Sequence, residues 1–379
     1  MTALITNPAT AVVAAAQSVL AKRYGVNVLL TDPEDLGGSG QAVVLRVRVA
    51  ESPIRLPRTL IVKQMWDSHE SGVEGFIREA VSYQFANSLA RGQRPGPELL
   101  AHDLSQRLLI LSDLGDARTL GVLLTGENPA SATHLLMALA QSLGRMHAVT
   151  AGRADDFGAL LRRARGTLSP QANTDDMSAA LPSVPALLSD ELGVSTPPEV
   201  LSAVESASQM FARGSFRAFT PADLCPDNIV VNTDGVKFLD YEWGGFRDAT
   251  LDLGCMLVSF PQCLCDLGLT VEQSDAMVEA WRAEIAGLWP QLLDDDVLYP
   301  RLLDARMLWV WLSTAWHLPD NYARRAIERD HALAVPPAQA LASRWAGLAL
   351  AADQIGADAI AEHADRVMDA LNRRTGFPG

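Results

Sequence analysis

The feature of this sequence that most constrains its fold is a change of pattern near residue 112. Before that point, short apolar or alternating segments predominate, as is typical of β-strands. These segments are Val26–Leu30, Ala42–Val49, Thr59–Met65, Glu98–His102 and Arg107–Leu111, with helical periodicity at residues 9–23 and 73–89. We therefore predict a small, mainly antiparallel sheet with one internal helix over residues 1–112.

Helical periodicity dominates the rest of the chain. It is clearest at Ala132–Val149 and recurs in segments that begin near residues 199, 271, 299, 337 and 357. One β-type island interrupts these helices, at Asn228–Asn232 and Val236–Leu239, and the Asn-Thr-Asp-Gly stretch between its halves is a strong hairpin signal. The sequence therefore predicts an α+β protein, with a larger, mostly helical part over residues 113–379.

The composition is that of a globular protein, with 48% hydrophobic and 20% charged residues. The formal net charge of -14 disfavours nonspecific nucleic-acid binding, because such binding depends on basic patches. The same charge would concentrate cationic ligands, or would serve only to keep the protein soluble. We therefore expect no nucleic-acid partner, and we leave the last two interpretations open.

The cysteine content and the hydropathy pattern indicate where in the cell the protein would be found. The four cysteines are too few to predict a disulfide framework, and Cys263 and Cys265 are too close together for the usual zinc pair. No apolar run reaches the length of a membrane span, and the first residues lack the pattern of a signal peptide. We therefore expect a cytoplasmic protein with no membrane partner.

The stretch with the most chemical information is Thr220–Asp240. It places Asp223 in a loop, Asn228 at the mouth of a strand, and Asp240 after the hairpin. Phosphoryl transfer needs a carboxylate that orients the attacking hydroxyl, and oxygen ligands that hold Mg2+ against the phosphates. The hairpin would fold Asp240 back beside Asn228, so that both could hold one ion. The alternative is an acidic loop followed by a surface hairpin.

Further segments occur in an order that resembles a known family. Asp240-Tyr241-Glu242-Trp243 is followed by an Asp-x-x-x-Asp-Leu pattern at residues 248–253, and Leu143-Gly144-Arg145-Met146-His147 precedes them on a predicted helix. Together with Thr220–Asp240, these segments resemble the aminoglycoside phosphotransferase and choline kinase-like family. The resemblance covers nearly the whole chain. It implies a two-lobed, protein-kinase-like fold, with a nucleotide-binding lobe at residues 1–112 and a catalytic and substrate-binding lobe at residues 113–379.

The resemblance also implies a set of nucleotide-binding residues. Gly38 and Ser39, in the turn Leu36-Gly37-Gly38-Ser39-Gly40-Gln41, would cover the phosphates of ATP or GTP. Lys63 would contact the phosphates, and Glu79 would pair with Lys63. Backbone groups at Ser112 and Leu114 would meet the adenine edge. Each feature also has a simpler interpretation, namely a β-turn, two surface charges, or a buried strand that ends in a turn.

One position departs from the family pattern. The family usually has a histidine two residues before the catalytic aspartate, where this chain has Pro221. Proline fixes φ and has no N–H donor, so the loop must be supported in a different way. We interpret His147 and Asp252 as structural residues, with Asp252 as an anchor for the catalytic loop.

These residues predict a Mg2+-dependent phosphotransferase. Asp223 would orient and deprotonate a hydroxyl acceptor, while Asn228 and Asp240 would hold Mg2+. The acceptor would be a small, hydroxylated and possibly cationic molecule, such as an aminoglycoside-like antibiotic. The alternatives are a kinase for an endogenous amino alcohol or sugar, and a kinase-like binding protein without catalysis. The protein would be a monomer or a homodimer.

Three tryptophans of one predicted helix, Trp309, Trp311 and Trp316, have two interpretations. Trp309 and Trp316 are seven residues apart and therefore share one helix face. They would form either a core stripe or an aromatic wall for the acceptor.

Overall fold

The structure is a computed structural model, and it describes residues 8–37, 42–66, 70–126, 128–166, 177–318 and 333–375. The chain divides into two compact units. The first comprises residues 1–117, 156–174 and 239–243, and the second comprises residues 118–155, 175–238 and 244–379. The first unit thus takes in two short segments from late in the sequence, and the second of them carries Asp240.

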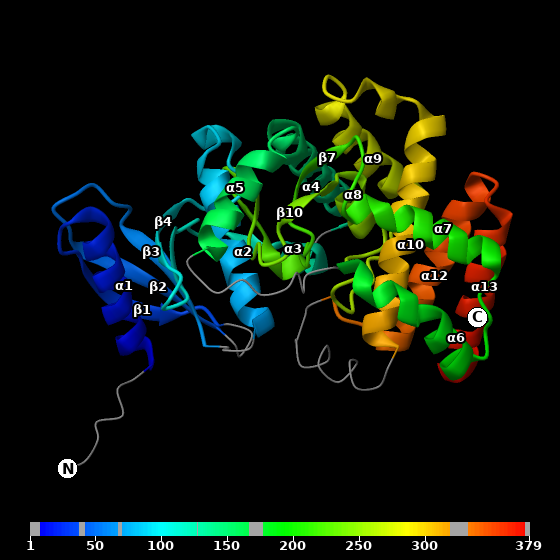
Figure 1. Cartoon of the computed structure of the whole chain (residues 1–379), viewed down its shortest axis with the longest axis horizontal. Coiled ribbons are helices and arrows are strands. Elements are labelled where there is room, and N and C mark those ends of the chain that lie inside the picture. Colours follow the sequence, from blue (N-terminus) through cyan, green and yellow to red (C-terminus); the bar gives the residue numbers. More distant parts are fainter. Residues whose placement is uncertain are drawn as a thin grey trace, which may run out of the picture. The chain divides into compact units, whose positions relative to one another are not determined.

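An antiparallel five-stranded sheet forms the centre of the first unit (Figure 1). The strand order is β1-β2-β3-β5-β4. The strands are β1 (Leu29–Asp35), β2 (Ala42–Glu51), β3 (Thr59–Met65), β4 (Leu99–Asp103) and β5 (Leu108–Ser112). The predicted small antiparallel sheet is confirmed, and β3 has both of its predicted ends.

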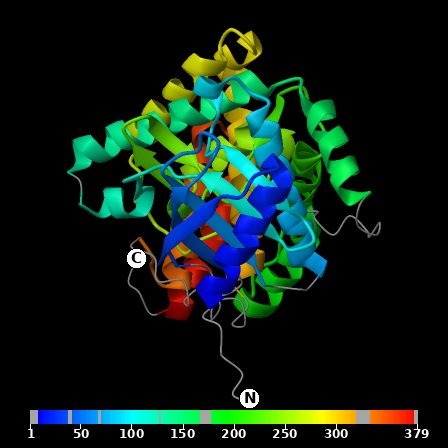
Figure 2. The ribbon, with the colours of Figure 1, turned by 90° about the vertical axis from the view of Figure 1, so that its left-hand side faces the viewer.

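Helix α1 (Pro8–Tyr24) packs on one face of this sheet (Figure 2). Its residues Val12, Ala16, Val19 and Leu20 join one core with Leu45, Val47, Leu60, Val62, Leu108 and Ile110 of the strands. Side chains alternate between the faces of a strand, so Lys63 of β3 points to the face opposite this core. On that face it meets Glu79 of α2 (Glu70–Asn87), at the distance given below.

The first predicted strand was placed wrongly. We expected Val26–Leu30, whereas β1 begins at Leu29 and continues through polar residues to Asp35. β1 is an edge strand, and its register with β2 shifts between Thr31 and Glu34. An edge strand can be polar and irregular because only one side of it pairs, so hydrophobicity alone does not locate it.

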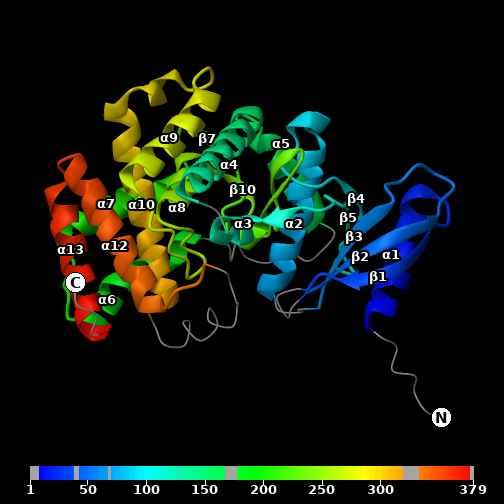
Figure 3. The ribbon, with the colours of Figure 1, turned by 180° about the vertical axis from the view of Figure 1, so that it is seen from behind.

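Helices make up most of the second unit (Figure 3). Helix α4 (Pro129–Thr150) packs against α9 (Val271–Ile285), and α12 (Pro337–Gln354) packs between α10 (Asp295–His317) and α13 (Asp358–Thr375). The shorter helices are α3 (Leu120–Gly126), α5 (Ala154–Arg165, most of which belongs to the first unit), α6 (Val184–Leu192), α7 (Pro198–Ser208) and α8 (Thr250–Leu257). Helix α10 starts four residues before its predicted start at Tyr299, because Asp294 caps it by accepting a hydrogen bond from the Asp296 N–H.

Two small antiparallel sheets hold the loop that contains Asp223. The predicted hairpin is present as β8 (Ile229–Asn232) and β9 (Gly235–Phe238), with β6 (Arg118–Thr119) beside β8. A second pair, β7 (Arg217–Thr220) and β10 (Gly245–Asp248), was not predicted. Each of these strands has only four residues, too few to give a clear periodicity. Among the described residues, every helix is too short or too polar to serve as a membrane span.

Candidate active site

Lys63 is the centre of a buried ion network in the first unit. Its Nζ lies 2.9 Å from Oε1 of Glu79 and 2.6 Å from Oδ1 of Asp240. Lys63 comes from a central strand, Glu79 from helix α2, and Asp240 from the segment that follows β9. The structure therefore brings together three of the residues that the sequence pointed to, across 177 positions of the chain.

The network contains more negative than positive charge. One lysine serves two carboxylates, and Oε2 of the fully buried Glu79 has no hydrogen-bond partner among the described residues. Burial by itself would lower the pKa of Lys63, but the charges of Asp240 and Glu79 outweigh it and raise that pKa. Burial raises the pKa of Glu79 to about 7, because the attraction of a shared Lys63 does not offset it. Such a site can accept a further cation.

Asp240 occupies an unusual backbone position. Its φ is 54°, in the left-handed region that residues other than glycine seldom adopt. Its N–H donates to the hydroxyl of Tyr83 over 3.3 Å, and Tyr241 is fully buried with its ring 4.8 Å from that of Tyr83. The Asp240 side chain is nevertheless 44% exposed. Backbone strain held by buried neighbours is common at functional sites, where it directs a side chain outward.

In the second unit, Asp223 lies in a buried loop after β7. Its Oδ1 accepts a hydrogen bond from the Cys225 N–H over 3.2 Å, and its side chain is 7% exposed. The preceding residue, Ala222, has a φ of 63° and is also buried. The loop thus holds a carboxylate in a fixed orientation, as a group that must orient a substrate hydroxyl requires.

Several residues support this loop around Pro221. Arg247 of β10 is buried and donates to the hydroxyl of Thr220 over 3.1 Å. The Thr220 hydroxyl in turn donates to the Gly245 carbonyl, and the Gln262 amide donates to the Ala222 carbonyl. These bonds enclose Pro221 on both sides, so the loop is ordered without a histidine at that position.

His147 and Asp252 form a buried hydrogen-bonded chain with Trp281. The indole N–H of Trp281 donates to Nδ1 of His147 over 3.0 Å, which leaves Nε2 as the protonated nitrogen that faces Asp252 at 3.1 Å. Burial raises the pKa of Asp252, while the His147 hydrogen bond and the backbone N–H of Ala222 oppose that rise. The His147 bond therefore joins Asp252 of α8 to helix α4, whereas Oδ1 of Asp252 has no hydrogen-bond partner among the described residues, and its role as an anchor of the loop stays a prediction.

The expected Mg2+ ligands have the chemistry that the ion prefers. β8 and β9 pair Ile229 with Phe238, so the hairpin ends with Asn228 just before one strand and Asp240 two residues after the other. Asn228 is half-buried, and its side chain makes no hydrogen bond to a described residue. No group of three or more described His, Cys, Asp or Glu residues is arranged to hold a metal. Mg2+ commonly takes one or two protein oxygens and completes its shell with phosphates and water, and the Asn228 amide oxygen and the Asp240 carboxylate are each of a kind that the ion binds.

The remaining nucleotide-binding predictions have different outcomes. Gly38 and Ser39 lie outside the described residues. Ser112 ends β5, where its N–H donates to the Glu98 carbonyl and its hydroxyl accepts from the Glu98 N–H. The hydrogen bonds of Ser112 therefore stabilise the sheet, and Leu114, half-buried two residues later, follows the strand end.

Sequence reasoning missed several residues that shape the site. Arg46 of β2 binds Asp113 over 2.9 Å and so fixes the segment after β5. The sequence could have pointed to Arg46, because arginine alternates with valine and leucine over residues Leu45–Val49. Arg247 and Gln262 had no such signal, since their partners are backbone and hydroxyl groups distant in sequence.

The tryptophans of α10 belong mainly to the core. Trp309 and Trp311 are each 1% exposed, and the Trp309 indole donates to the Leu251 carbonyl. Only Trp316 is half-buried. The core-stripe interpretation therefore holds for the first two.

No protein-family model matches the sequence, and no curated protein matches it. Among solved structures, it is similar to a choline/ethanolamine kinase family protein from Mesorhizobium loti, with 16% identity, a TM-score of 0.50, and coverage of 96% of this chain and 99% of that one. The choline kinase LicA from Streptococcus pneumoniae has 14% identity, a TM-score of 0.47, and coverage of 87% and 98%. The aminoglycoside 2'-phosphotransferase-IIIa has 10% identity, a TM-score of 0.48, and coverage of 96% and 99%. The likeness to the first of these structures shows the fold, and the predicted kinase-like α+β architecture is confirmed.

Proposed function

We propose that the protein transfers the γ-phosphate of ATP or GTP to a hydroxyl group of a small molecule. The observation that carries this proposal is the Lys63 network, in which one buried strand lysine meets a helix glutamate and the aspartate after the hairpin. A lysine held in this way presents a fixed positive charge to phosphates. The surplus of carboxylates around it suits a bound cation.

Each residue has a defined role in this proposal. Asp223 orients the acceptor hydroxyl and takes its proton, because it is the buried carboxylate of an ordered loop. Lys63 holds the phosphates, and Glu79 keeps Lys63 in place. Asn228 and Asp240 would hold Mg2+, which when bound offsets the negative charge of the phosphates. The backbone around Ser112 and Leu114 would face the base, with Gly38 and Ser39 over the phosphates.

We propose a small hydroxylated acceptor, and we favour cationic ones. The net charge of -14 supports this choice, because an acidic surface raises the local concentration of cations. Aminoglycoside-like antibiotics and endogenous amino alcohols, such as choline and ethanolamine, share a hydroxyl beside a positive charge. Sugars are the uncharged comparison.

The test is an ATP- and GTP-consumption assay over these three acceptor classes, with product detected by mass spectrometry. Asp223→Asn should lower the turnover of any confirmed acceptor by roughly a thousandfold, within the range of general-base catalysis. Asp227→Asn is the matched control, because Asp227 is an exposed carboxylate of the same loop. Equal turnover by wild type and Asp223→Asn would refute the catalytic assignment.

Pro221 favours a second candidate, a kinase-like protein that binds nucleotide without catalysis. Thermal unfolding with and without Mg-ATP separates the two, since a ligand that binds only the folded state raises the melting temperature. A rise in melting temperature with turnover of an acceptor supports the enzyme. A rise without turnover across all acceptor classes supports the binding protein.

A further inference from the structure

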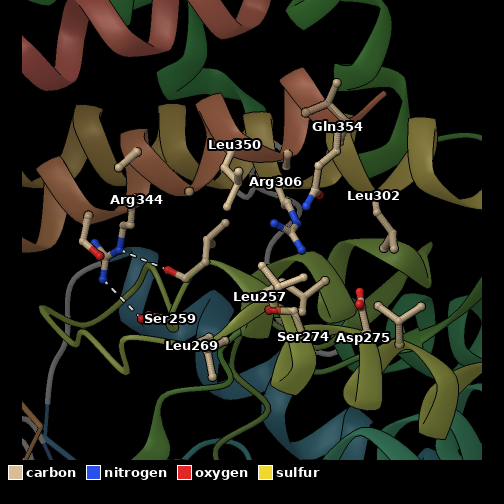
Figure 4. A pocket seen from close by; sticks show the side chains of 18 of the residues that line it. Leu257, Ser259, Leu269, Ser274, Asp275, Leu302, Arg306, Arg344, Leu350 and Gln354 are labelled. Atoms are coloured by element: carbon tan, nitrogen blue, oxygen red, sulfur yellow. Dashed lines mark hydrogen bonds between the residues drawn. The ribbon is translucent and has the colours of Figure 1, made fainter. Parts of the chain in front are cut away.

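A cavity of about 510 Å³ lies among helices α8, α9, α10 and α12 of the second unit (Figure 4). Its volume lies within the usual range for small-molecule sites. None of the residues from Thr220 to Asp240 lines it, so it is separate from the loop that carries Asp223. Its walls are mixed: Leu257, Leu269, Val278, Leu302 and Leu350 are apolar, whereas other lining residues are polar or charged.

Arg306 of α10 is a half-buried arginine that lines this cavity. Its Nε is buried without a hydrogen-bond partner, and the side chain makes no hydrogen bond or ion pair with any described residue. Figure 4 shows it extending from α10 into the cavity, between the α12 wall and the side that carries Leu257 and Ser274. Burial lowers the pKa of Arg306 to about 10, so the guanidinium stays charged at neutral pH. Arg306 as a whole is half-buried, so an anion inside the cavity would meet its guanidinium with less competition from water than at an open surface.

The other arginine of the cavity is already satisfied. Arg344 of α12 donates to the Ser313 hydroxyl and to the carbonyls of five residues between Val258 and Cys265. The donors of Arg344 therefore serve the fold, and Arg306 is the arginine of this cavity that we expect to receive an anion.

The mouth of the cavity is apolar and open. Val271, Leu350 and Ile355 line it and are 43%, 51% and 38% exposed. Gly347, in the middle of α12, adds to this opening, because a Cβ built there would meet no atom within 4 Å. Glycine in a helix interior costs stability relative to alanine. At Gly347 it leaves room in the cavity that a side chain would fill.

We propose that this cavity is a second small-molecule site, which binds an amphipathic carboxylate with its anionic group on Arg306 and its hydrocarbon part against the leucine wall. This site goes beyond the proposed phosphotransferase function and does not depend on it. Asp266 and Asp275 also line the cavity, and the charge of Asp275 acts on Arg306, so a bound carboxylate must compete with it.

The test uses sodium octanoate as the probe, with 1-octanol and octylammonium as controls, on the full chain without nucleotide. Isothermal titration should show saturable binding of octanoate to the wild type and much weaker binding of both controls. Arg306→Met should weaken octanoate binding at least about tenfold, since hydrogen bonds to charged groups are the stronger ones. Asp275→Asn should strengthen it, because a like charge is removed.

Gly347→Leu is the second variant, and it keeps the test valid if Arg306→Met misfolds. It should fill the cavity and abolish octanoate binding while it leaves the melting temperature unchanged or raised. Equal binding of octanoate by wild type and Arg306→Met would overturn the proposal. So would binding of 1-octanol as tight as that of octanoate, or no saturable binding to the wild type up to about 10 mM, which is weaker than typical small-ligand affinities.

Discussion

Lys63 in the first unit and Arg344 in the second are both buried cations, yet their partners differ in kind. Lys63 pairs with two carboxylates that come from separate segments, and one of them, Asp240, is 44% exposed. Arg344 donates to one hydroxyl and to carbonyls of a single stretch, residues 258–265. The first set of partners can be exchanged for a ligand, whereas the second set is part of the backbone.

This difference in partners separates a side chain that can bind a ligand from one that only stabilises the fold. Carbonyl groups at the end of α8 would be left without donors if Arg344 did not reach them. Ser259 and Phe260, within that stretch, have φ values of 58° and 54°, which the Arg344 bonds help to hold. Asp240 has a similar φ, but there the strain directs an open carboxylate. Strained backbone alone therefore does not identify a site, because residues 259 and 260 share the φ of Asp240 and serve the fold.

The largest expected effect is on the Lys63 side of the comparison. Asp240→Asn should lower phosphotransfer turnover by roughly a thousandfold, because charge stabilisation at a phosphoryl site is worth several kcal/mol. The free energy of unfolding should change by less than about 1 kcal/mol, since Lys63 keeps Glu79 as a partner. Steady-state kinetics and urea unfolding measure the two quantities. If Asp240→Asn turned over substrate as fast as the wild type, Asp240 would be a structural residue, and the contrast between Lys63 and Arg344 would fail.

The next effect is on stability. Arg344→Met should lower the free energy of unfolding by about 3 kcal/mol, because it leaves several buried carbonyls without donors. Arg306→Met, on the same cavity, is the matched control and should change that free energy by less than about 1 kcal/mol in either direction. Urea unfolding at neutral pH measures both variants. Equal losses would show that the two arginines do not differ as their hydrogen bonds indicate.

The sequence predicted the first of these two regions better than the second. Asp240 was predicted from a local pattern, an aspartate after a hairpin turn, whereas Lys63, Glu79 and their roles were implied by the resemblance to a known family. Ile61, Val62 and the rest of β3 were predicted to the residue, because a central strand is buried and strongly patterned.

Arg344 and the strands around Asp223 could not be predicted in the same way. The partners of Arg344 are backbone carbonyls about 80 positions earlier, and a carbonyl has no sequence signature. β7 and β10 are four residues each and pair across 25 positions. The support of Pro221 by Arg247 and Gln262 follows from that pairing. Tertiary contacts of this kind are decided by packing and not by local propensity.

Gln262 connects the two kinds of region, and its removal should have a smaller effect. It lies in the stretch that Arg344 holds, and its amide donates to the carbonyl of Ala222, beside Asp223. Gln262→Met should lower turnover about tenfold through misplacement of Asp223, a mild case of the loss that misalignment causes. The KM for nucleotide should stay unchanged, because Gln262 positions the acceptor side. Gln141→Met, a surface control bonded to Glu284, should change neither quantity. A rise in KM without a fall in turnover would contradict this role.

The smallest expected effect concerns a third buried group, a histidine of α13, whose surroundings differ from those of Lys63 and Arg344. His363 of α13 is 1% exposed, and both of its ring nitrogens lack a hydrogen-bond partner among the described residues. Burial, and then the charge of Arg366, lower the pKa of His363 to about 4. The folded state therefore binds a proton less readily than the unfolded state, so stability is complete above pH 6.5 and is lost as the pH falls toward 4.

His363→Phe should remove that loss while the edge-to-face contact with Trp345 is kept. Between pH 7 and pH 6, the free energy of unfolding of the wild type should fall by about 0.7 kcal/mol more than that of the variant. Urea unfolding at the two pH values measures the difference, with His134→Phe, an exposed position on α4, as the matched control. The same pH dependence in wild type and His363→Phe would mean that other groups carry the acid sensitivity. A weaker pH dependence of stability in His363→Phe would show that a buried group without a partner costs this protein stability in acid. Lys63 and Arg344 avoid that cost through their contacts.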